Sequence, residues 1–480
     1  MTRLVIGPFN RVEGDLEVKL DVQDGTVRSA QVVAPLFRGF ETMLTGKTPS
    51  DALIFVPRIC GICSVSQSVA AARAIGAAQG LSISGNGALS INIVHAIENI
   101  ADHLTHFYLF FMPDFARPSY ASRVWHEDIV QRFAAVKGTS AADVLPARAQ
   151  FLQMLGILAG KWPHTLSIRP GGSTRAVSAA EQARLAGLLM GFRRFLERHL
   201  YGDRLESLAA LNSAETLGLW TKRRSVSNSD FGQFLAISED LKLETLGRAH
   251  DRFLSVGAYR SEHGHLFVPG IHDGTHGSFD PALVAEDTDN AWYEKGQGRL
   301  APFEGLTAPA YDDTAGYSWC KAPRYGGKPF EVGALARQVV NGHPLLIDLV
   351  RKGGGNVHSR VVARMTELAA TVIALEKWVA ALEPEGPFSV PDRDPKTGNG
   401  IGLTEAARGS LGHWLSVRDG RIANYQIIAP TTWNFSPRDN DGVAGPLEQA
   451  LTGMPIEGPD SVNVQHIVRS FDPCMVCTVH

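Results

Sequence analysis

The sequence predicts an α+β fold that is mainly α, in which a core bundle of long helices is flanked by small peripheral β-sheets. Residues 87–112 repeat apolar side chains with the 3.6-residue period of a helix, and residues 4–34 alternate apolar and polar side chains as strands do. Two C-x-x-C pairs stand near opposite ends of the chain, and they must meet if they bind one metal ion. Both termini are therefore expected at a central metal site, within one domain that spans residues 1–480.

Composition and charge exclude several classes of protein. The chain has 480 residues, of which 44% are hydrophobic and 20% are charged, as in ordinary globular proteins. Its net charge of −3 gives no basis for binding nucleic acid or an anionic membrane surface. No run of about 18 apolar residues predicts a membrane segment, and Met1–Pro8 lacks the apolar stretch of a signal peptide. We expect a cytoplasmic protein, or else one exported on a partner's signal peptide.

The other elements follow from local patterns. In the N-terminal β region, about residues 4–34, Asp24-Gly25 is a turn signal typical of a hairpin. Residues 255–330 are rich in glycine, aspartate and aromatic residues, which predicts irregular structure with short strands, and the prolines and glycines of 384–402 predict a loop. Helices are expected at 51–80, beginning near the first cysteine pair, and at 140–160, 178–200, 330–352 and 357–383.

The helix predicted at 87–112 carries a second, mostly polar stripe beside its apolar one. Spacings of three and four residues place the members of this stripe on one side of a helix. Such a stripe either faces solvent or lines a functional site, and the pattern alone leaves both readings open. The stripe consists of His95, Asn99, Asp102, His106 and Phe110.

The cysteines carry the clearest chemistry. Two C-x-x-C pairs, Cys60/Cys63 and Cys474/Cys477, supply four sulfur ligands, a set that suits zinc, iron or nickel. Zinc ribbons space their pairs by about 15–20 residues. Here the pairs lie near opposite ends of the chain, which excludes a local zinc module and favours a functional metal at the centre of the molecule, although a structural zinc stays open. Cys320 stands alone.

Motifs along the whole chain resemble those of nickel–iron hydrogenase large subunits. The first cysteine pair lies in a segment similar to the family's R-x-C-G-x-C, and the second in one similar to its D-P-C-x-x-C-x-x-H. The matching segments are Arg11-Val12-Glu13-Gly14, Arg38-Gly39-Phe40-Glu41, Arg58–Cys63, Tyr317–Trp319, Lys321–Tyr325, Glu331–Gly333, Ala407-Arg408-Gly409, Pro430–Asn434 and Asp472–His480.

The resemblance implies a Ni-Fe(CN)2(CO) centre that binds H2 and cleaves it heterolytically. Cys60 and Cys474 would be terminal nickel ligands, whereas Cys63 and Cys477 would bridge nickel to an iron that carries CO and cyanide. Bridging sulfurs hold two metals close together, so that H2 can be polarised between a Lewis acid and a basic sulfur.

The same resemblance assigns roles to residues around the metals. Glu13 would be the first proton relay, with a surface carboxylate beside Arg11 as the alternative reading. Arg408 would lie over the open metal position, since a guanidinium there can hydrogen-bond cyanide or orient small ligands. Thr431 would donate to the other cyanide. Asp102 and Asp472 would join Arg408, which favours the functional reading of the polar stripe, although Asp472 could also be a turn residue before Pro473.

The C-terminal residue has an implied role as well. In the family this histidine becomes terminal when a protease among the maturation proteins removes an extension. His480 would then bind Mg2+ or Fe2+ together with the Glu41 carboxylate and the Ile427 carbonyl, since oxygen ligands suit magnesium. The default alternative is a frayed terminal histidine. Whether the terminus is cleaved or encoded is open from the sequence.

The chain departs from the catalytic members of the family at several positions. Gln67 stands four residues after Cys63, where those members usually have a histidine, and an amide cannot carry protons near pH 7 as an imidazole can. Ile62 and Phe110 replace smaller Val and Leu at the end of the gas channel, and should let H2 pass while hindering O2. Ala407 replaces a proline, which puts the placement of Arg408 in doubt. Gln67, Ile62 and Phe110 together resemble the H2-sensing, regulatory hydrogenases, which turn over slowly and signal to a histidine kinase.

The number of cysteines and the resemblance to hydrogenase large subunits both imply a partner subunit. All four cysteines in metal-type spacing are assigned, so this chain should carry no Fe-S cluster, and electrons must leave through an iron–sulfur small subunit, in a heterodimer or a dimer of heterodimers. The competing interpretations are an energy-conserving uptake hydrogenase, a structural zinc protein, and a complex I-type subunit without the metal, which retention of all four cysteines disfavours.

Overall fold

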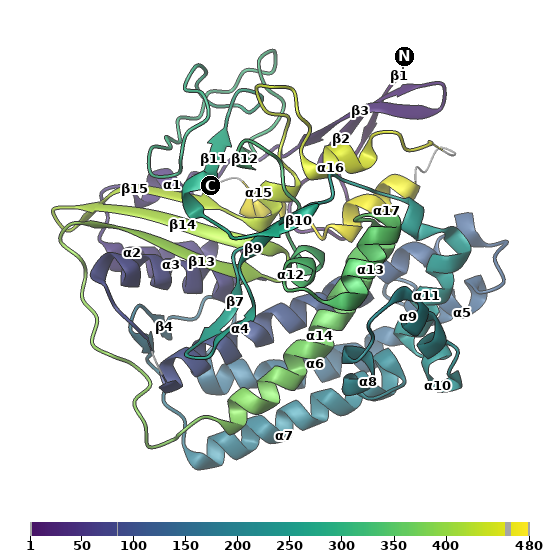
Figure 1. Ribbon diagram of the computed structural model, residues 1–480, viewed down its shortest axis with the longest axis horizontal. Helices are drawn as coiled ribbons and strands as arrows, with labels where there is room; N and C mark the ends of the chain where they lie inside the picture. Colours follow the sequence, from purple (N-terminus) through teal and green to yellow (C-terminus); the bar gives the residue numbers. More distant parts are fainter. Residues whose placement is uncertain (1, 84, 457–461, 479–480) are drawn as a thin grey trace.

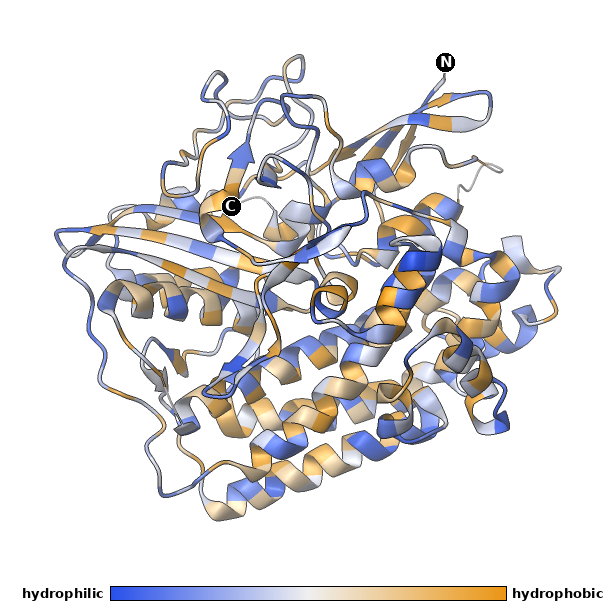
Figure 2. Ribbon diagram, viewed as in Figure 1, coloured by the Kyte–Doolittle hydropathy of each residue, from blue (hydrophilic) through white to orange (hydrophobic). Residues whose placement is uncertain are grey.

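The computed structural model describes residues 2–83, 85–456 and 462–478. Its core is a layer of long helices, α4 (Gly85–Thr105), α6 (Ser140–Ala159), α7 (Ala179–Phe195) and α14 (Val357–Ala380), in which α4 packs against α6 and α14 (Figure 1). Figure 2 shows apolar residues along these packed helices. Capping boxes begin two of them, Ser178 with Glu181 at α7 and Asn356 with Ser359 at α14. The predicted mainly α bundle is confirmed.

Two of the predicted helices are interrupted. The helix expected at 330–352 is two helices, α12 (Ala334–Val340) and α13 (Pro344–Gly353), because Gly342 turns the chain with a φ of 80°. The helix expected at 51–80 is divided into α2 (Pro49–Phe55), the short turn η1 (Val56–Arg58) and α3 (Ser64–Gln79). Residues 59–63, which include the first cysteine pair, form the break before α3.

The predicted helix at 87–112 is α-helical only as far as Thr105. A π-helical turn, η2 (His106–Phe111), and a 3-10 turn, η3 (Met112–Ala116), continue it. The π turn takes one more residue per hydrogen-bonded ring, so Phe110 is no longer at α-helical spacing from the polar stripe.

Several shorter helices were not predicted from the sequence. Most of them lie between the long helices in sequence and cover their ends or follow the strands. They are α1 (Phe40–Leu44), α5 (His126–Phe133), α8 (Leu205–Ala209), α9 (Ala214–Thr221), α10 (Arg224–Ser227), α11 (Asp230–Leu241), α15 (Pro430–Asn434), α16 (Pro446–Leu451) and α17 (Val462–Ser470). The helix predicted at 178–200 is α7 continued by a π-helical turn, η5 (Leu196–Tyr201). No helix within the described residues is long and apolar enough to cross a membrane.

The N-terminal sheet forms as expected, with β1 (Thr2–Ile6), β2 (Glu17–Gln23) and β3 (Thr26–Val33) in antiparallel order around the Asp24-Gly25 turn. Small two- and three-stranded sheets also occupy the irregular region. Their strands are β6 (Arg252–Ser255), β7 (Ala258–Ser261), β8 (Gly264–Phe267), β9 (Gly270–Asp273), β10 (Thr275–Gly277), β11 (Val284–Asp287) and β12 (Ala322–Tyr325), and one further pair is β4 (Ile168–Arg169) with β5 (Gly172–Ser173).

A sheet that the sequence reading missed lies against α3. It consists of β13 (Gly398–Ala406), β14 (Gly409–Arg418) and β15 (Arg421–Ile428), so the loop predicted at 384–402 ends where β13 begins. Glycines allow the close approach: a Cβ on Gly400 or Gly402 would lie only 1.9 or 1.8 Å from a carbonyl oxygen of α3. The β13–β14 turn, residues 407–408, therefore lies close to the end of α3 that carries Cys63.

Candidate metal centre

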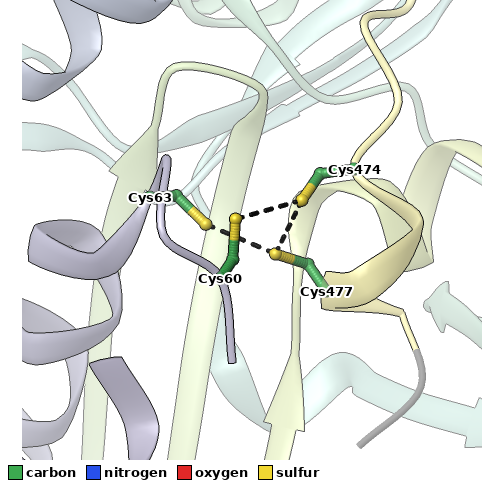
Figure 3. A group of neighbouring side chains, drawn as sticks. All are labelled: Cys60, Cys63, Cys474 and Cys477. Atoms are coloured by element: carbon green, nitrogen blue, oxygen red, sulfur yellow. Dashed lines mark hydrogen bonds between the residues drawn. The ribbon is translucent and has the colours of Figure 1, made fainter. Parts of the chain in front are cut away.

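The four cysteines of the two C-x-x-C pairs meet in one buried cluster (Figure 3). Cys60 and Cys63 come from the break before α3, and Cys474 and Cys477 follow α17, so both ends of the chain reach the site. The four sulfur atoms all lie within 4.8 Å of one another. Sγ–Sγ distances are 3.0 Å for Cys474–Cys477 and 3.3 Å for both Cys60–Cys474 and Cys63–Cys477.

These thiols need a cation if all of them are to ionise. Hydrogen bonds from Cys474 and Cys477 hold the pKa of Cys60 well below its ordinary value, whereas burial raises the pKa of Cys474. The pKa of Cys63 is raised as well, mainly by its hydrogen bond with Cys474. Four sulfur donors at this spacing in a dry interior fit nickel, iron or zinc, and a bound metal deprotonates the thiols outright. The residues present therefore fit a thiolate-bound metal centre.

Two features of the N-terminal region hold the cysteine segments together. The Arg38 guanidinium donates to the carbonyl oxygens of Arg58 at 3.1 Å, of Val476 at 3.3 Å, and of Ile59. Gly14 has a φ of 80°, and a Cβ there would lie 2.9 Å from the Val476 side chain. The arginine of R-G-x-E and the glycine of R-x-E-G thus serve to pack the backbone around the metal ligands.

Arg408 is buried beside the cysteines and binds both predicted carboxylates. Its guanidinium donates to Asp102 Oδ2 at 2.6 Å and to Asp472 Oδ1 at 3.0 Å, and its Nε donates to the Asp472 carbonyl at 2.9 Å. Burial, and then the negative charge of Asp472, raise the pKa of Asp102, while Arg408 opposes both. Asp472 has a φ of 58°, so it turns the chain as well as binding the guanidinium.

A second buried arginine supports Arg408 in the absence of a proline at position 407. The Arg337 guanidinium donates to the carbonyl oxygens of Ala406 and Ala407, both at 2.8 Å, and is itself bound by Glu367 and Glu405 at 2.7 Å. The doubt that Ala407 raised about the placement of Arg408 is therefore answered by these contacts. Sequence reading missed Arg337, although a charge inside the otherwise apolar run ALARQVV was a signal.

Glu98 was also missed, and it caps the helix that follows Cys63. Its carboxylate accepts from the backbone amides of Val65 at 2.8 Å and Ser66 at 2.9 Å, and from Trp162 Nε1 at 2.9 Å. These amides are in the first turn of α3, where no carbonyl of the helix can bind them. Burial raises the pKa of Glu98 to about 7. Its signal was its spacing, three residues after His95 and four before Asp102, which places it beside the polar stripe of α4.

The polar stripe of α4 faces the protein interior, so its reading as a solvent-exposed face is wrong. His95, Asn99, Asp102 and His106 are each at most 3% exposed. His95 contacts Ser66 of α3 at 3.2 Å, Asn99 donates to the Glu405 carbonyl at 3.1 Å, and His106 contacts the Arg469 carbonyl at 2.7 Å. The stripe joins α3, β13 and α17 around the cysteines.

Glu13 and Thr431 both lie beside the second cysteine pair. Glu13 forms an isolated parallel bridge with Cys474, and its carbonyl accepts from the Met475 amide at 2.7 Å. Burial and the nearby Cys60 raise the pKa of the half-buried Glu13 carboxyl. Its alternative reading, a surface carboxylate beside Arg11, is therefore disfavoured. The Thr431 hydroxyl accepts from the Cys474 amide at 3.0 Å, which leaves its hydrogen free to donate.

Gln67 is buried one turn into α3 and is paired with a histidine from β14. Gln67 Oε1 lies 2.8 Å from His413 Nε2, and His413 Nδ1 lies 2.8 Å from the Tyr425 hydroxyl. Burial lowers the pKa of His413 to about 3, so this imidazole is neutral near pH 7. Gln67 Nε2 is buried without a partner among the described residues. Neither the amide nor this imidazole supplies a group that titrates near neutral pH.

The remaining predicted residues lie as follows. Ile62 precedes Cys63 and is half-buried against the apolar core, and Phe110 is half-buried on η2. The gas channel itself stays a prediction. Glu41 and Ile427 are together, because the Ile427 amide donates to Glu41 at 2.8 Å. His480 lies outside the described residues.

The surroundings of Glu41 carry negative charge in excess. The Lys321 ammonium lies 3.0 Å from Glu41 and 3.5 Å from Glu286, and Glu286 Oε1 is buried without a partner among the described residues. Burial raises the pKa of Glu286 to about 7. Two buried carboxylates around one ammonium fit a further cation held through oxygen ligands.

Comparison with known proteins gives one consistent family. The model of the nickel-dependent hydrogenase family matches residues 38–124 and 142–480. The large subunit of the periplasmic [NiFeSe] hydrogenase of Desulfomicrobium baculatum is 32% identical, with 100% of this chain and 95% of the relative covered. The hydrogenase-2 large chain of Escherichia coli (strain K12) is 29% identical, with 100% and 97% covered. The uptake hydrogenase large subunit of Rhodobacter capsulatus is 27% identical, with 100% and 95% covered.

Solved structures agree with these matches. The reduced Ni-Fe-Se hydrogenase from D. vulgaris Hildenborough superposes with a TM-score of 0.86 at 30% identity over all of both chains. A reduced, active form of the Ni-Fe-Se hydrogenase from Desulfomicrobium baculatum superposes with a TM-score of 0.85 at 29% identity, also over all of both chains.

Proposed function

Since the chain belongs to the nickel-dependent hydrogenase family and is a hydrogenase large subunit that activates H2, we propose that it serves as a cytoplasmic, O2-tolerant H2 sensor with low turnover. The observation that carries H2 activation is the cluster of four buried thiols directly beside the Arg408 guanidinium. Infrared spectra of the purified protein with and without H2 test the proposal, because bands of CO and cyanide that shift under H2 require a loaded and responsive centre. A spectrum without such bands would contradict it.

In the proposed centre, Cys60 and Cys474 would hold nickel, and Cys63 and Cys477 would be shared by nickel and iron. The bound Ni-Fe(CN)2(CO) group supplies the Lewis acid that polarises H2. Arg408, held between Asp102 and Asp472, presents donors to a cyanide or to a small ligand, and the free Thr431 hydrogen serves the other cyanide. Asp102 and Asp472 thus orient the guanidinium of Arg408, and Thr431 orients a ligand of the centre.

Glu13 would accept the proton that is released when H2 is cleaved at the centre. Its raised pKa suits a carboxyl that holds a proton briefly and passes it on. The Glu13→Gln variant keeps the size and hydrogen-bonding capacity of the side chain but cannot be protonated in this way. We expect H/D exchange between D2 and water to fall about 100-fold, within the range of general acid–base catalysis, while nickel and iron remain bound. Exchange at the parent rate in the loaded variant would show that Glu13 is not the relay.

The sensor role rests on the environment of Gln67. At the position where catalytic members have a histidine, this chain has an amide bonded to a neutral, buried His413. A proton cannot leave the bridging side of the site through this pair, which is consistent with slow turnover. The alternative, an energy-conserving uptake hydrogenase, is favoured by the similarity of this chain to the uptake hydrogenase large subunit of Rhodobacter capsulatus. Turnover with an artificial acceptor separates the two, because an uptake enzyme should oxidise H2 much faster.

O2 tolerance is proposed for Ile62 and Phe110. The double variant Ile62→Val, Phe110→Leu widens the approach to the metals by removing one methylene from Ile62 and part of the ring volume of Phe110. We expect H2 oxidation to be lost under air within minutes in this variant and to persist in the parent protein. Single-residue variants should show intermediate loss. Unchanged activity of the double variant after prolonged exposure to air would exclude these residues as the gate.

The proposed protein has an iron–sulfur partner subunit and a second metal ion near Glu41. Electrons leave through an iron–sulfur small subunit, since large subunits of this family are paired with one, and a histidine kinase receives the signal. The Glu41 carboxylate, the Ile427 carbonyl and His480 hold Mg2+ or Fe2+, supported by the excess negative charge around Lys321. Maturation proteins insert the metals, and no Fe-S cluster is held by this chain.

A further inference from the structure

A carboxylate outside the metal centre is surrounded by three arginines. Asp114, on η3, is fully buried, and its oxygens accept from Arg11, from Arg117 at 2.9 Å and from Arg469 at 2.7 Å. His466 Nδ1 lies 3.6 Å away. One buried anion with this many donors is strongly held in place, because removing it would leave several cations unpaired.

Arg11 connects Asp114 to the loop that carries Glu13, the proposed proton relay. Arg11 stands two residues before Glu13 and has a φ of 55°, a conformation that a non-glycine residue adopts only when its surroundings enforce it. One guanidinium nitrogen of Arg11 binds Asp114, and the other donates to the Phe110 carbonyl at 3.2 Å. Asp114 thereby fixes the loop that carries Glu13 to the π turn that carries Phe110.

Arg469 connects Asp114 to the C-terminal segment that carries Cys474 and Cys477. Arg469 lies near the end of α17, three residues before Asp472. In addition to Asp114, it donates to the carbonyl of Asn10 at 2.8 Å and to the Asn10 side chain at 2.7 Å. Asp114 therefore holds both the N-terminal loop and the segment that leads from α17 to Cys474. These two segments pair with each other at Glu13 and Cys474.

We propose that Asp114 is a positioning residue which, through Arg11 and Arg469, sets the position of the Glu13 carboxylate relative to the cysteine sulfurs and so the rate of proton transfer. This inference rests on the proposed relay by Glu13. Asp114 does not carry protons itself. Although burial raises its pKa, the nearby His466 and the charge of Arg469 hold that pKa well below the ordinary value, so the group stays ionised.

The test is Arg11→Lys in the metal-loaded heterodimer. Lysine keeps the charge, but its single ammonium cannot bind Asp114 and the Phe110 carbonyl in the planar arrangement of a guanidinium. A displacement of about 1 Å at a reacting group can cost as much as 100-fold in rate. We expect D2/H2O exchange to fall about tenfold while the infrared bands and their shift under H2 stay as in the parent. Asp114→Asn should slow exchange at least as much, and Asp114→Glu should restore part of it.

Arg132→Lys is the matched control. Arg132 binds the buried Asp230 with two bonds of 2.8 Å, and its side chain is 18% exposed against 19% for Arg11. Its contacts with Asp230, Asp143 and Thr139 lead to neither cysteine segment. This variant should exchange D2 at the parent rate. Equal slowing in Arg132→Lys and Arg11→Lys would reduce the effect to general loosening and overturn the proposal.

A double-variant cycle separates positioning from a structural role. If Arg11 acts through Glu13, the pair Arg11→Lys, Glu13→Gln should exchange no more slowly than Glu13→Gln alone. Independent, multiplied losses would overturn the proposal, and so would parent-rate exchange in Arg11→Lys when Glu13→Gln is slow. If Glu13→Gln itself exchanges at the parent rate, the relay fails and this inference fails with it.

Discussion

Replacing Cys477 by alanine should abolish H2 activation and leave a protein without nickel and iron. The thiol of Cys477 lies 3.0 Å from that of Cys474 and 3.3 Å from that of Cys63, so it is an integral part of the four-thiol cluster. Three thiolates cannot complete the donor set of the proposed centre, and no further cysteine lies in the cluster among the described residues. We expect H2 oxidation to fall by at least ~1000-fold, which corresponds to about 4 kcal/mol in the barrier.

Loss of the metals should also lower stability. Metal binding to a preformed site stabilises the folded chain, since the unfolded chain has no such site. This cluster joins both ends of the chain, so the unloaded variant should melt at a lower temperature and be cleaved more readily by proteases at its terminal segments. Elemental analysis and a thermal melt measure both effects.

Cys320→Ala is the matched control for this experiment. Cys320 is as buried as the ligands, but its Sγ lies against the Lys321 carbonyl, at 3.3 Å, rather than in the cluster. The variant should keep nickel, iron and H2 oxidation. Magnesium at Glu41 should persist in Cys477→Ala, if that ion is held as proposed. Full metal content in Cys477→Ala would contradict the assignment of the cluster.

The sequence predicted the parts of the site that lie within short motifs. The cysteines could be named from the spacing of their two pairs, and Arg408, Asp472 and Glu13 because their segments resemble motifs of nickel–iron hydrogenase large subunits. Helices with regular apolar periods, such as α4, α6 and α14, were predictable for a similar reason. The interruptions of the predicted helices could not be predicted from the sequence. The π turn at His106–Phe111 and the break at Gly342 depend on tertiary packing that local periodicity does not record.

The parts of the site that were not predicted depend on contacts between residues far apart in the sequence. The partner of Gln67 is His413, and the carbonyls that Arg337 holds belong to a turn about seventy residues away in sequence. Strand β13 is hard to predict because the glycines at 400 and 402 lower its β-propensity. The same glycines allow β13 to contact α3 closely. The local signals of this network were the charge of Arg337 within the mainly apolar run 334–340 and the spacing of Glu98 beside the polar stripe of α4.

Replacing Arg408 by lysine should have the second largest effect, and it acts without removing a metal ligand. The guanidinium bridges Asp102 and Asp472 and binds the Asp472 backbone as well. A lysine ammonium is a point charge on a flexible stem and cannot reproduce this planar set of bonds. At least one buried carboxylate would lose its partner, which costs about 3 kcal/mol. We expect the variant to melt at a lower temperature while it still binds nickel and iron.

H2 activation in Arg408→Lys should fall on the order of 100-fold, as expected for the loss of a preorganised donor at the reacting site. Arg324→Lys provides the comparison, because Arg324 is also fully buried and binds Asp439 at 2.7 Å, but contacts none of the cysteine segments. That variant should lose a similar amount of stability and keep its activity per loaded centre. If Arg408→Lys lost stability alone, with activity per loaded centre unchanged, the arginine would be a structural counter-ion for two buried carboxylates and would have no part in activating H2.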